Sequence, residues 1–455
     1  MEIHTKMEKW FTAILMTICF SAHAECVEMR LDECIRVGIE NNLEIKNSSE
    51  NIRLAELTLS ENRYKLLPVI EAFGSFTNNV DKGATVGKTS LMGTEPSPDA
   101  NWMQSVGMRY NTTGGIQMTM PLYDQTIYTG IDIAKKTREL RKLQYDQARE
   151  RLIIEIAKLY YLAQTTQEQI GLANENLDRL NKLQDITQAL LDNGAILLDD
   201  KERVDYQLED ARVQKSKLES LLTQQINLLK FWMNLSPEQD ICVTRLEFVE
   251  PDRNSDAPLN YDLPELQALR KQQEIQTAQI KQIKQGYLPS LSFRGQLGYT
   301  KYEEHFSDYF HSNTPRSWYN SFYWGLTLKV PIFDGFHKHT SIKKSTVNLT
   351  MLQNDYENMV SNLETKHRNS LTRLYSDIDT YNRQYANYLL AKDIYVTTKD
   401  KYKEGVSSMT DLLRDETNIT SAQNSYVNAY YSYQLTRLDL LQLNGELETL
   451  VNNKK

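Results

Sequence analysis

Cysteine and histidine are the residues that most often bind metals, and cysteine also carries out thiol redox chemistry. In this chain both are few and scattered. There are four cysteines and seven histidines in 455 residues. None falls in a CxxC, HxxxH or HExxH spacing, so the usual zinc and thiol-redox signatures are missing. The sequence also presents no set of nucleophile, base and metal ligands. We therefore expect no catalytic residues, no metal and no cofactor.

Charge and composition exclude two further classes of protein. With 52 basic and 60 acidic side chains the formal net charge is −8, which disfavours nucleic acid as a partner. A mean hydropathy of −0.55 is too low for a bundle of membrane-spanning helices, each of which needs about 20 mostly apolar residues. The 18 glycines and 11 prolines are few for a chain of this length, so we expect long uninterrupted elements.

The N-terminus has the pattern of a signal peptide. A basic start precedes an apolar run at residues 11 to 20, and Ala22 and Ala24 follow with the small side chains that a signal peptidase requires. The run is too short to span a bilayer. We expect residues 1–24 to be removed; the alternative is an N-terminal helix of the core.

Three cysteines remain after this cleavage: Cys26, Cys34 and Cys242. A bridge between Cys26 and Cys34 is one option in an oxidising compartment, although three cysteines do not define a disulfide framework. A lipid anchor on Cys26 is disfavoured, because Glu25 stands where lipoprotein cleavage sites have a small residue. The state of all three cysteines stays open at this stage.

The sequence contains the same series of motifs twice. The pairs, in order, are YKLLPVIEAFGSF and QGYLPSLSFRGQL, MTMPLYD and LKVPIFDG, NGAILLDD and EGVSSMTD, and WMNLS and LQLNG. Their offsets are 221, 210, 211 and 210 residues. This predicts a tandem duplication, with repeats at 25–234 and 263–445, an irregular connector at 235–262 and a tail at 446–455.

Each repeat is predicted to run helix, strand, strand and helical hairpin. A helix at 30–67, and another at 263–288, should end before a Leu-Pro pair. Period-two alternation predicts strands at 69–80, 104–120, 290–302 and 318–330. The polar segments between them, 81–103 and 303–317, are predicted to be exposed loops.

Long proline-free stretches follow the second strand of each repeat. They predict antiparallel helical hairpins at 128–233 and 338–445, which turn at Gly194 and Gly405. From Leu152 to Leu180 apolar or small residues recur at the alternating four-and-three spacing of a coiled coil. A helix over 128–192 would be about 97 Å long at about 1.5 Å per residue, so it must pack against other long helices.

The four predicted strands have the length of membrane strands, about ten residues. Four strands cannot close a barrel, and lipid tolerates no unpaired strand edge, so several chains would have to contribute to one barrel. An aromatic girdle at the bilayer interface would come from Trp318, Tyr319, Phe322, Tyr323 and Trp324. The alternative is a hydrophobic sheet in the core of a soluble protein.

On these motifs the chain resembles the TolC-like outer-membrane efflux channels. RLDECIRVGIENNLEI resembles that family's first-helix signature, LLP with MPLYD or VPIFDG its strand borders, and the two GxxxxxD turns its periplasmic tips. The match runs from about residue 29 to 448. It implies an α+β membrane protein: a homotrimer with a twelve-stranded barrel among outer-membrane lipid and a periplasmic tube of helices. It also implies a passive channel that docks onto a periplasmic adaptor and an inner-membrane pump or ABC exporter.

The resemblance further implies a gate at the hairpin tips. Asp411 matches an acidic gate position and Tyr402 a gating tyrosine, and Asp200 is the corresponding acid of the first repeat. Arg414 stands where a second gate acid is often found, and Ser407 where an arginine often holds the closed state. We therefore expect closure to involve a pair between Asp411 and Arg414.

The same turns also have a purely structural interpretation. Residues 408 to 411, Ser-Met-Thr-Asp, fit a capping box at the start of the returning helix. Candidates for adaptor docking at the tips are Gly194, Leu197, Leu198, Gly405 and Val406. The alternative is that the glycines only permit the turns and the leucines are buried within the hairpin.

Two other functions fit parts of the pattern. A type I protein-secretion channel would use the same fold with a different pump. A soluble periplasmic coiled-coil scaffold would share the long helices but not the strand pairs. The sequence predicts an export channel and leaves its substrate and pump class open.

Overall fold

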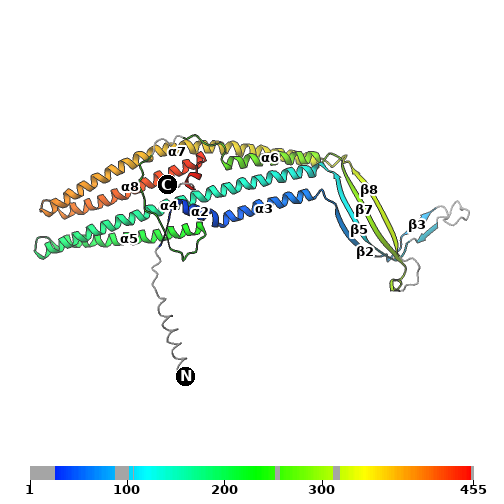
Figure 1. Ribbon diagram of the computed structural model, residues 1–455, viewed down its shortest axis with the longest axis horizontal. Coiled ribbons are helices and arrows are strands. Elements are labelled where there is room, and N and C mark those ends of the chain that lie inside the picture. The colour runs from blue at the N-terminus through cyan, green and yellow to red at the C-terminus, as the bar shows by residue number, and fades with distance from the viewer. Residues whose placement is uncertain (1–25, 88–101, 106, 252–256, 311–317, 452–455) are drawn as a thin grey trace, which may run out of the picture. The chain divides into compact units, whose positions relative to one another are not determined.

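The computed structural model describes residues 26–87, 102–105, 107–251, 257–310 and 318–451 (Figure 1). The predicted signal peptide, 1–24, lies outside them. The chain divides into two compact units. Unit 1 contains the segments up to Asn51, Lys142–Ala268 and the chain from Asp355; unit 2 contains Ile52–Arg141 and Leu269–Asn354. Each predicted repeat therefore contributes to both units.

Unit 2 contains a four-stranded antiparallel sheet in the order β2-β5-β7-β8. Its strands are β2 (Val69–Asn78), β5 (Tyr110–Tyr123), β7 (Ser290–Glu303) and β8 (Tyr319–Lys329). At the central pair Gly115 lies opposite Gly298, and a Cβ atom at Gly115 would lie 2.2 Å from the carbonyl oxygen of Leu297. Only glycine allows the two backbones to approach this closely.

One of the four predicted strands is wrong in its extent. The prediction placed it at 104–120, but β5 begins at Tyr110 and continues past Pro121 to Tyr123, with a register shift between those two residues. Such a bulge accommodates a proline, which has no N–H for the ladder. Residues 104 and 105 belong instead to a separate two-stranded sheet of β3 (Ala84–Gly87) with β4 (Trp102–Ser105), most of which falls within the predicted loop. The other three strands lie within two residues of their predicted bounds.

Long helices connect to these strands. The bounds are α3 (Leu43–Tyr64), α4 (Gln125–Asp192), α5 (Leu198–Met233), α6 (Pro264–Gln285), α7 (His337–Lys403) and α8 (Met409–Asn444). In unit 1 the α4/α5 hairpin lies beside the α7/α8 hairpin, and both turn at the same end (Figure 1). No helix of the described residues is both long and apolar enough to cross a membrane.

The first predicted helix, 30–67, is broken at Asn42. It consists of α2 (Leu31–Asn41) and α3, because the Asn42 side chain takes over the role of a cap. Its Oδ1 accepts hydrogen bonds from the backbone N–H groups of Glu44 at 2.8 Å and Ile45 at 3.3 Å, and its Nδ2 donates to the carbonyl of Trp232 at 2.9 Å. Asparagine is among the residues most favoured at a helix start.

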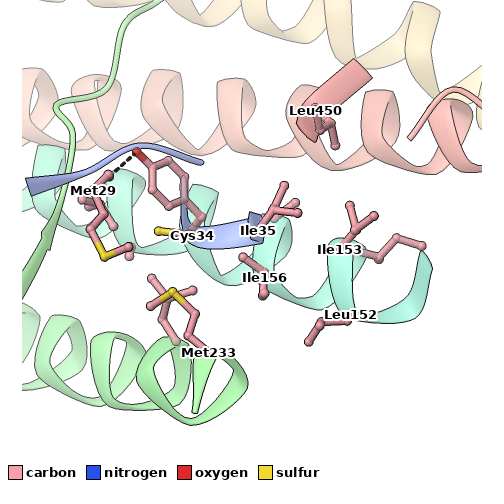
Figure 2. Close-up of a cluster of buried hydrophobic side chains, with 14 of the residues drawn as sticks. Met29, Cys34, Ile35, Leu152, Ile153, Ile156, Met233 and Leu450 are labelled. Carbon is pink, nitrogen blue, oxygen red and sulfur yellow. Dashed lines mark hydrogen bonds between the residues drawn. The ribbon is translucent and has the colours of Figure 1, made fainter. Parts of the chain in front are cut away.

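The largest hydrophobic core of unit 1 forms where α2 packs on α4 and α5 (Figure 2). Ile156 and Met233 are fully buried there, and burial of such a side chain stabilises the fold by about 1.5–3 kcal/mol. Gly38 lets α2 approach α4, since a Cβ atom there would lie 2.3 Å from Cδ1 of Ile156. The hydroxyl of Tyr160 donates to the carbonyl of Met29 at 3.1 Å and ties the N-terminal segment to this core.

The N-terminal strand is attached covalently to the connector. β1 (Val27–Met29) pairs in parallel with β6 (Ile241–Val243), and a disulfide joins Cys26 to Cys242. The pairing of Cys26 with Cys34 is therefore wrong: Cys34 is buried in the core of α2 as a free thiol, and burial, aided by Glu33, raises its pKa to about 12. The Cys26 sulfur is not available for a lipid anchor while it forms the bridge. In the predicted tail, a short helix α9 (Glu448–Val451) packs on α2.

Candidate functional site

The sheet of unit 2 separates apolar and polar side chains onto its two faces, because successive residues of a strand point to opposite sides. On β8 the apolar series consists of Phe322, Trp324, Leu326 and Leu328, which are all exposed. The register places them beside apolar residues of the neighbouring strands, and the rows include Ile70 with Met118, Met120 with Phe293 and Leu326, and Leu297 with Phe322. One face is therefore an apolar surface that the described chain leaves uncovered.

The opposite face is polar and hydrogen-bonded across the strands. Glu71, Gln117, Gln296 and Tyr323 stand in one row, one on each strand. Gln117 donates to Glu71 at 2.9 Å, and the hydroxyl of Tyr323 donates to Oε1 of Gln296 at 2.7 Å. Strands that separate lipid from a water-filled interior alternate in this way, apolar outward and polar inward.

The five predicted girdle residues do not share one face. Phe322 and Trp324 belong to the apolar face, whereas Tyr319 and Tyr323 belong to the polar face, and Trp318 precedes β8. All five side chains are exposed. The expectation of an aromatic girdle toward lipid is therefore restricted to Phe322 and Trp324.

At the hairpin tips the two predicted turns form at glycines. Gly194 has φ 69° and Gly405 φ 75°, and the residue after each donates a backbone hydrogen bond into the preceding turn, as in a Schellman cap. Leu197, Leu198 and Val406 are exposed. The interpretation that the two leucines are buried within the hairpin is therefore wrong, and these apolar side chains are accessible at the tip.

Asp411 makes both interactions that the sequence suggested. Ser408 is the N-cap of α8: its Oγ accepts the backbone N–H of Asp411 at 3.1 Å and donates to the Asp411 carboxylate at 2.6 Å. Arg414 approaches the same carboxylate at 3.2 Å. The Ser408 hydroxyl, and to a smaller extent Arg414, lower the pKa of Asp411. Asp411 is therefore both the hydrogen-bond partner of the Ser408 cap and an ion-pair partner of Arg414.

Tyr402 interacts electrostatically with the acid of the other hairpin, Asp200, although no hydrogen bond joins them. It is half-buried near the end of α7, and its hydroxyl has no hydrogen-bond partner among the described residues. Burial raises its pKa, and the charge of Asp200 at the start of α5 raises it further. The structure thus brings Tyr402 near Asp200 of the first hairpin, and Arg414 near Asp411 of the second.

A buried contact between the hairpins carries no sequence signal. The guanidinium of Arg179 on α4 lies 2.8 Å from the Glu416 carboxylate on α8, and these side chains are only 19% and 6% exposed. Arg179 also lies over the ring of Tyr395 on α7, 5.9 Å from its centroid. Burial, reinforced by the charge of Glu416, raises the pKa of Tyr395. The two partners stand 237 residues apart, so spacing could not have revealed them.

Around this pair the four helices share a hydrophobic core, which we call the tip core. It contains Leu180, Leu183, Val204, Leu208, Ala211, Tyr395, Met409, Leu412, Leu413 and Ile419. Within one chain, the tip core and the buried ion pair of Arg179 with Glu416 therefore hold the two hairpins together.

Comparisons with known proteins agree with this geometry. The model of the outer membrane efflux protein family matches twice, at residues 39–234 and 262–446. The outer membrane protein TolC of Salmonella enteritidis is 20% identical over 361 residues, 77% of this chain and 71% of that protein. TolC of Vibrio cholerae is 22% identical over 340 residues, 74% and 77% of the two chains.

Solved structures share the fold. The outer membrane protein VceC from Vibrio cholerae superposes with a TM-score of 0.71 at 14% identity, over 91% of this chain and 96% of that one. The CmeC outer membrane channel of Campylobacter jejuni gives 0.70 at 17% identity, over 91% and 85%. The first family match covers the predicted first repeat from residue 39 onward, and the second covers 263–445. The chain therefore belongs to the outer membrane efflux protein family, as an outer-membrane exit channel with its helical part in the periplasm.

Proposed function

We propose that three copies of this chain form one passive conduit, which receives its cargo from a periplasmic adaptor and an inner-membrane pump. The observation that carries this proposal is the two-faced sheet, apolar and exposed on one side and polar on the other. Its outer strands, β2 and β8, each have only one neighbour among the described strands. In lipid such edges must be paired.

Pairing β8 of one copy with β2 of the next satisfies both edges without a new element. A cyclic assembly closes when each copy presents the same two edges. The four-stranded sheet in three copies gives about twelve strands, above the minimum of about eight seen in membrane barrels. The polar row that contains Glu71 and Tyr323 would then face the interior of the conduit.

At the other end, the tips would close the conduit and bind the adaptor. Three copies of Asp411 and Arg414 would meet around the axis, and the Arg414 side chain, 64% exposed, remains free enough to reach a neighbouring copy. The exposed Leu197, Leu198 and Val406 would give the adaptor an apolar contact beside Gly194 and Gly405.

The proposal is tested with two adjacent residues that point to opposite faces of β8. Trp324→Lys places a charge on the apolar face, where a lysine costs about 2–4 kcal/mol at the bilayer centre and about 0–1 kcal/mol near an interface. Tyr323→Lys places the same charge on the polar face. We expect Trp324→Lys to be lost from the outer-membrane fraction and Tyr323→Lys to insert.

The mass of the detergent-extracted wild type, measured by light scattering, should be that of three chains, and the protein should conduct ions in a planar bilayer. A salt-extractable monomer without conductance would overturn the proposal. Equal insertion of the two lysine variants would show that the exposed apolar face does not meet lipid.

A further inference from the structure

The segment where β8 passes into α7 exposes large apolar side chains next to basic ones. Ile332, Phe333 and Phe336 are 95%, 75% and 67% exposed, and the rings of the two phenylalanines stand perpendicular with their centroids 5.4 Å apart. His337, His339, Lys343 and Lys344 follow on the first turns of α7, all exposed, and Lys281 and Lys284 stand on the last turns of α6, the helix before β7. We call the three apolar and six basic residues the junction patch.

A cavity of about 280 Å³ lies within this segment. Its lining includes Tyr287, Ile332, Phe333, Asp334 and Lys338. The carboxylate of Asp334 is already engaged by its own chain: it accepts the backbone N–H of Lys338 at 3.0 Å and lies 3.4 Å from the ammonium of that residue. The same ammonium stands 4.9 Å from the ring centroid of Tyr287. The cavity therefore combines apolar walls with a neutralised acid.

The local charge contrasts with that of the whole protein. Residues 281–290 and 331–344 contain five lysines and two histidines against the single carboxylate of Asp334, whereas the whole chain has a net charge of −8. Within the described part of the chain no ion pair engages Lys281, Lys284, Lys343 or Lys344. A ligand with negative charge would therefore meet four available ammonium groups here.

The first repeat is an internal control for what the fold requires. At the offset of 210 residues, His337 corresponds to Ile127, His339 to Thr129, and Lys343 and Lys344 to Ile133 and Ala134. The same turn from strand to long helix forms in both repeats. The first repeat carries its own lysine pair two residues further along, at Lys135 and Lys136. The two histidines and the positions of the two lysines in the second repeat are thus not needed to build the turn.

The apolar part of the patch continues the exposed face of the sheet. Leu326 and Leu328 of β8 lead through the exposed Val330 to Ile332. If that face meets the hydrocarbon of the membrane, as the proposed function requires, the patch lies where the hydrocarbon ends and headgroups begin, on the side of the helices. Basic side chains near such a surface attract anionic lipid, and aromatic rings favour this boundary.

We infer that the junction patch binds the anionic phospholipid headgroups of the leaflet that faces the helices. Ile332, Phe333 and Phe336 enter the boundary of the acyl chains. The lysines of α6 and α7 contact the phosphate groups, and the cavity beside Tyr287 receives part of one lipid. This inference rests on the proposed function, since it requires the sheet to lie in the bilayer.

The test uses the full mature protein, purified in detergent and freed of lipid. It is titrated with phosphatidylglycerol or with phosphatidylcholine of the same acyl chains, and bound lipids are counted by native mass spectrometry. The test variant is Lys284→Gln/Lys343→Gln/Lys344→Gln. The matched control is Lys182→Gln/Lys217→Gln/Lys392→Gln, three exposed lysines on the helices of unit 1.

We expect the wild type and the control variant to bind phosphatidylglycerol at least fivefold more tightly than phosphatidylcholine, and the test variant to lose most of this preference. Salt at 0.5 M should weaken the preference as well, because it screens exposed charges. Equal preference in all three proteins would overturn the inference. Flotation with liposomes distinguishes a failure of this inference from a failure of the proposed function. A wild type that floats and conducts without lipid preference refutes only the inference, whereas failure to float refutes the proposed function.

Discussion

Removal of Arg179 should weaken the contact between the two hairpins by an amount that depends on pH. Arg179→Met removes the cationic partner of Glu416, whose side chain is 6% exposed. The variant can keep that carboxylate buried and charged, or it can protonate it. For a glutamate with an ordinary pKa of about 4.3, protonation at pH 7 costs about 3.7 kcal/mol, at 1.36 kcal/mol per pH unit. This sets the expected loss at about 3–4 kcal/mol, which agrees with other broken buried pairs.

The loss in Arg179→Met should depend on pH, and variants of Glu416 should differ from it. At pH 5 protonation costs about 1 kcal/mol, so the loss should shrink to about that value. Glu416→Gln should cost less than Arg179→Met at pH 7, because Arg179 keeps Glu175 within 3.9 Å and is more exposed. The double variant should recover most of the loss, since it leaves no buried charge.

Native-state hydrogen exchange of the amides at residues 412–420 measures the free energy of local opening directly. The control is Arg212→Met, which breaks an exposed pair with Glu209 and should change opening by less than about 1 kcal/mol. A loss in Arg179→Met that does not vary between pH 5 and pH 7, or that only equals the loss in the control, would refute the reasoning.

Three further changes probe other parts of unit 1. Burial, reinforced by Asp146, raises the pKa of Glu150 to about 7. The folded protein therefore binds this proton more tightly than the unfolded chain, and the free energy of unfolding falls as the pH rises to about 7. At pH 8, Glu150→Gln should therefore raise the free energy of unfolding by about 1–2 kcal/mol, after allowance for solvent screening, and with it the melting temperature. At pH 4 the melting temperature should not change. An equal gain at both pH values would contradict this. Asp411→Asn should raise ion conductance several-fold in planar bilayers if its pair with Arg414 helps to close the tip. Unchanged conductance of the folded protein would leave Asp411 only as the partner of the Ser408 helix cap. Cys26→Ser should lower stability toward urea by up to about 5 kcal/mol, the loop-entropy value for 216 residues, and Cys242→Ser should have the same effect with no further loss in the double variant.

The sequence predicted the order of elements because each is long and regular. Pro68 and Pro289 end helices, and Gly194 and Gly405 close turns, so local backbone chemistry placed these boundaries. The break at Asn42 was missed although its signal was present: two consecutive asparagines in a helical pattern favour a new cap. The hydrogen bonds from the backbone N–H groups of Glu44 and Ile45 to the Asn42 side chain outweighed the helix propensity around them.

Contacts between distant segments could not be predicted in the same way. Of the residues in β4, 102 and 103 were predicted as loop and 104 and 105 were assigned to the wrong strand, because period-two alternation does not identify the partner. The disulfide of Cys26 with Cys242 and the ion pair of Arg179 with Glu416 join segments more than two hundred residues apart, and neither spacing nor composition reports on such pairs. The distribution of the aromatic candidates over two faces could have been predicted. Period-two alternation within 318–324 separates Phe322 and Trp324 from the two tyrosines.

The disulfide also gives the chain a closed covalent topology. Cys26 and Cys242 enclose the whole first repeat in one ring of the polypeptide, with the second repeat attached to it as a tail. A protease that cuts once between these cysteines opens the ring but releases no fragment, so the nicked protein migrates as a full-length chain until it is reduced. One cut after Cys242 separates two pieces at once. The two homologous halves of this channel therefore differ in how they withstand proteolysis in the periplasm.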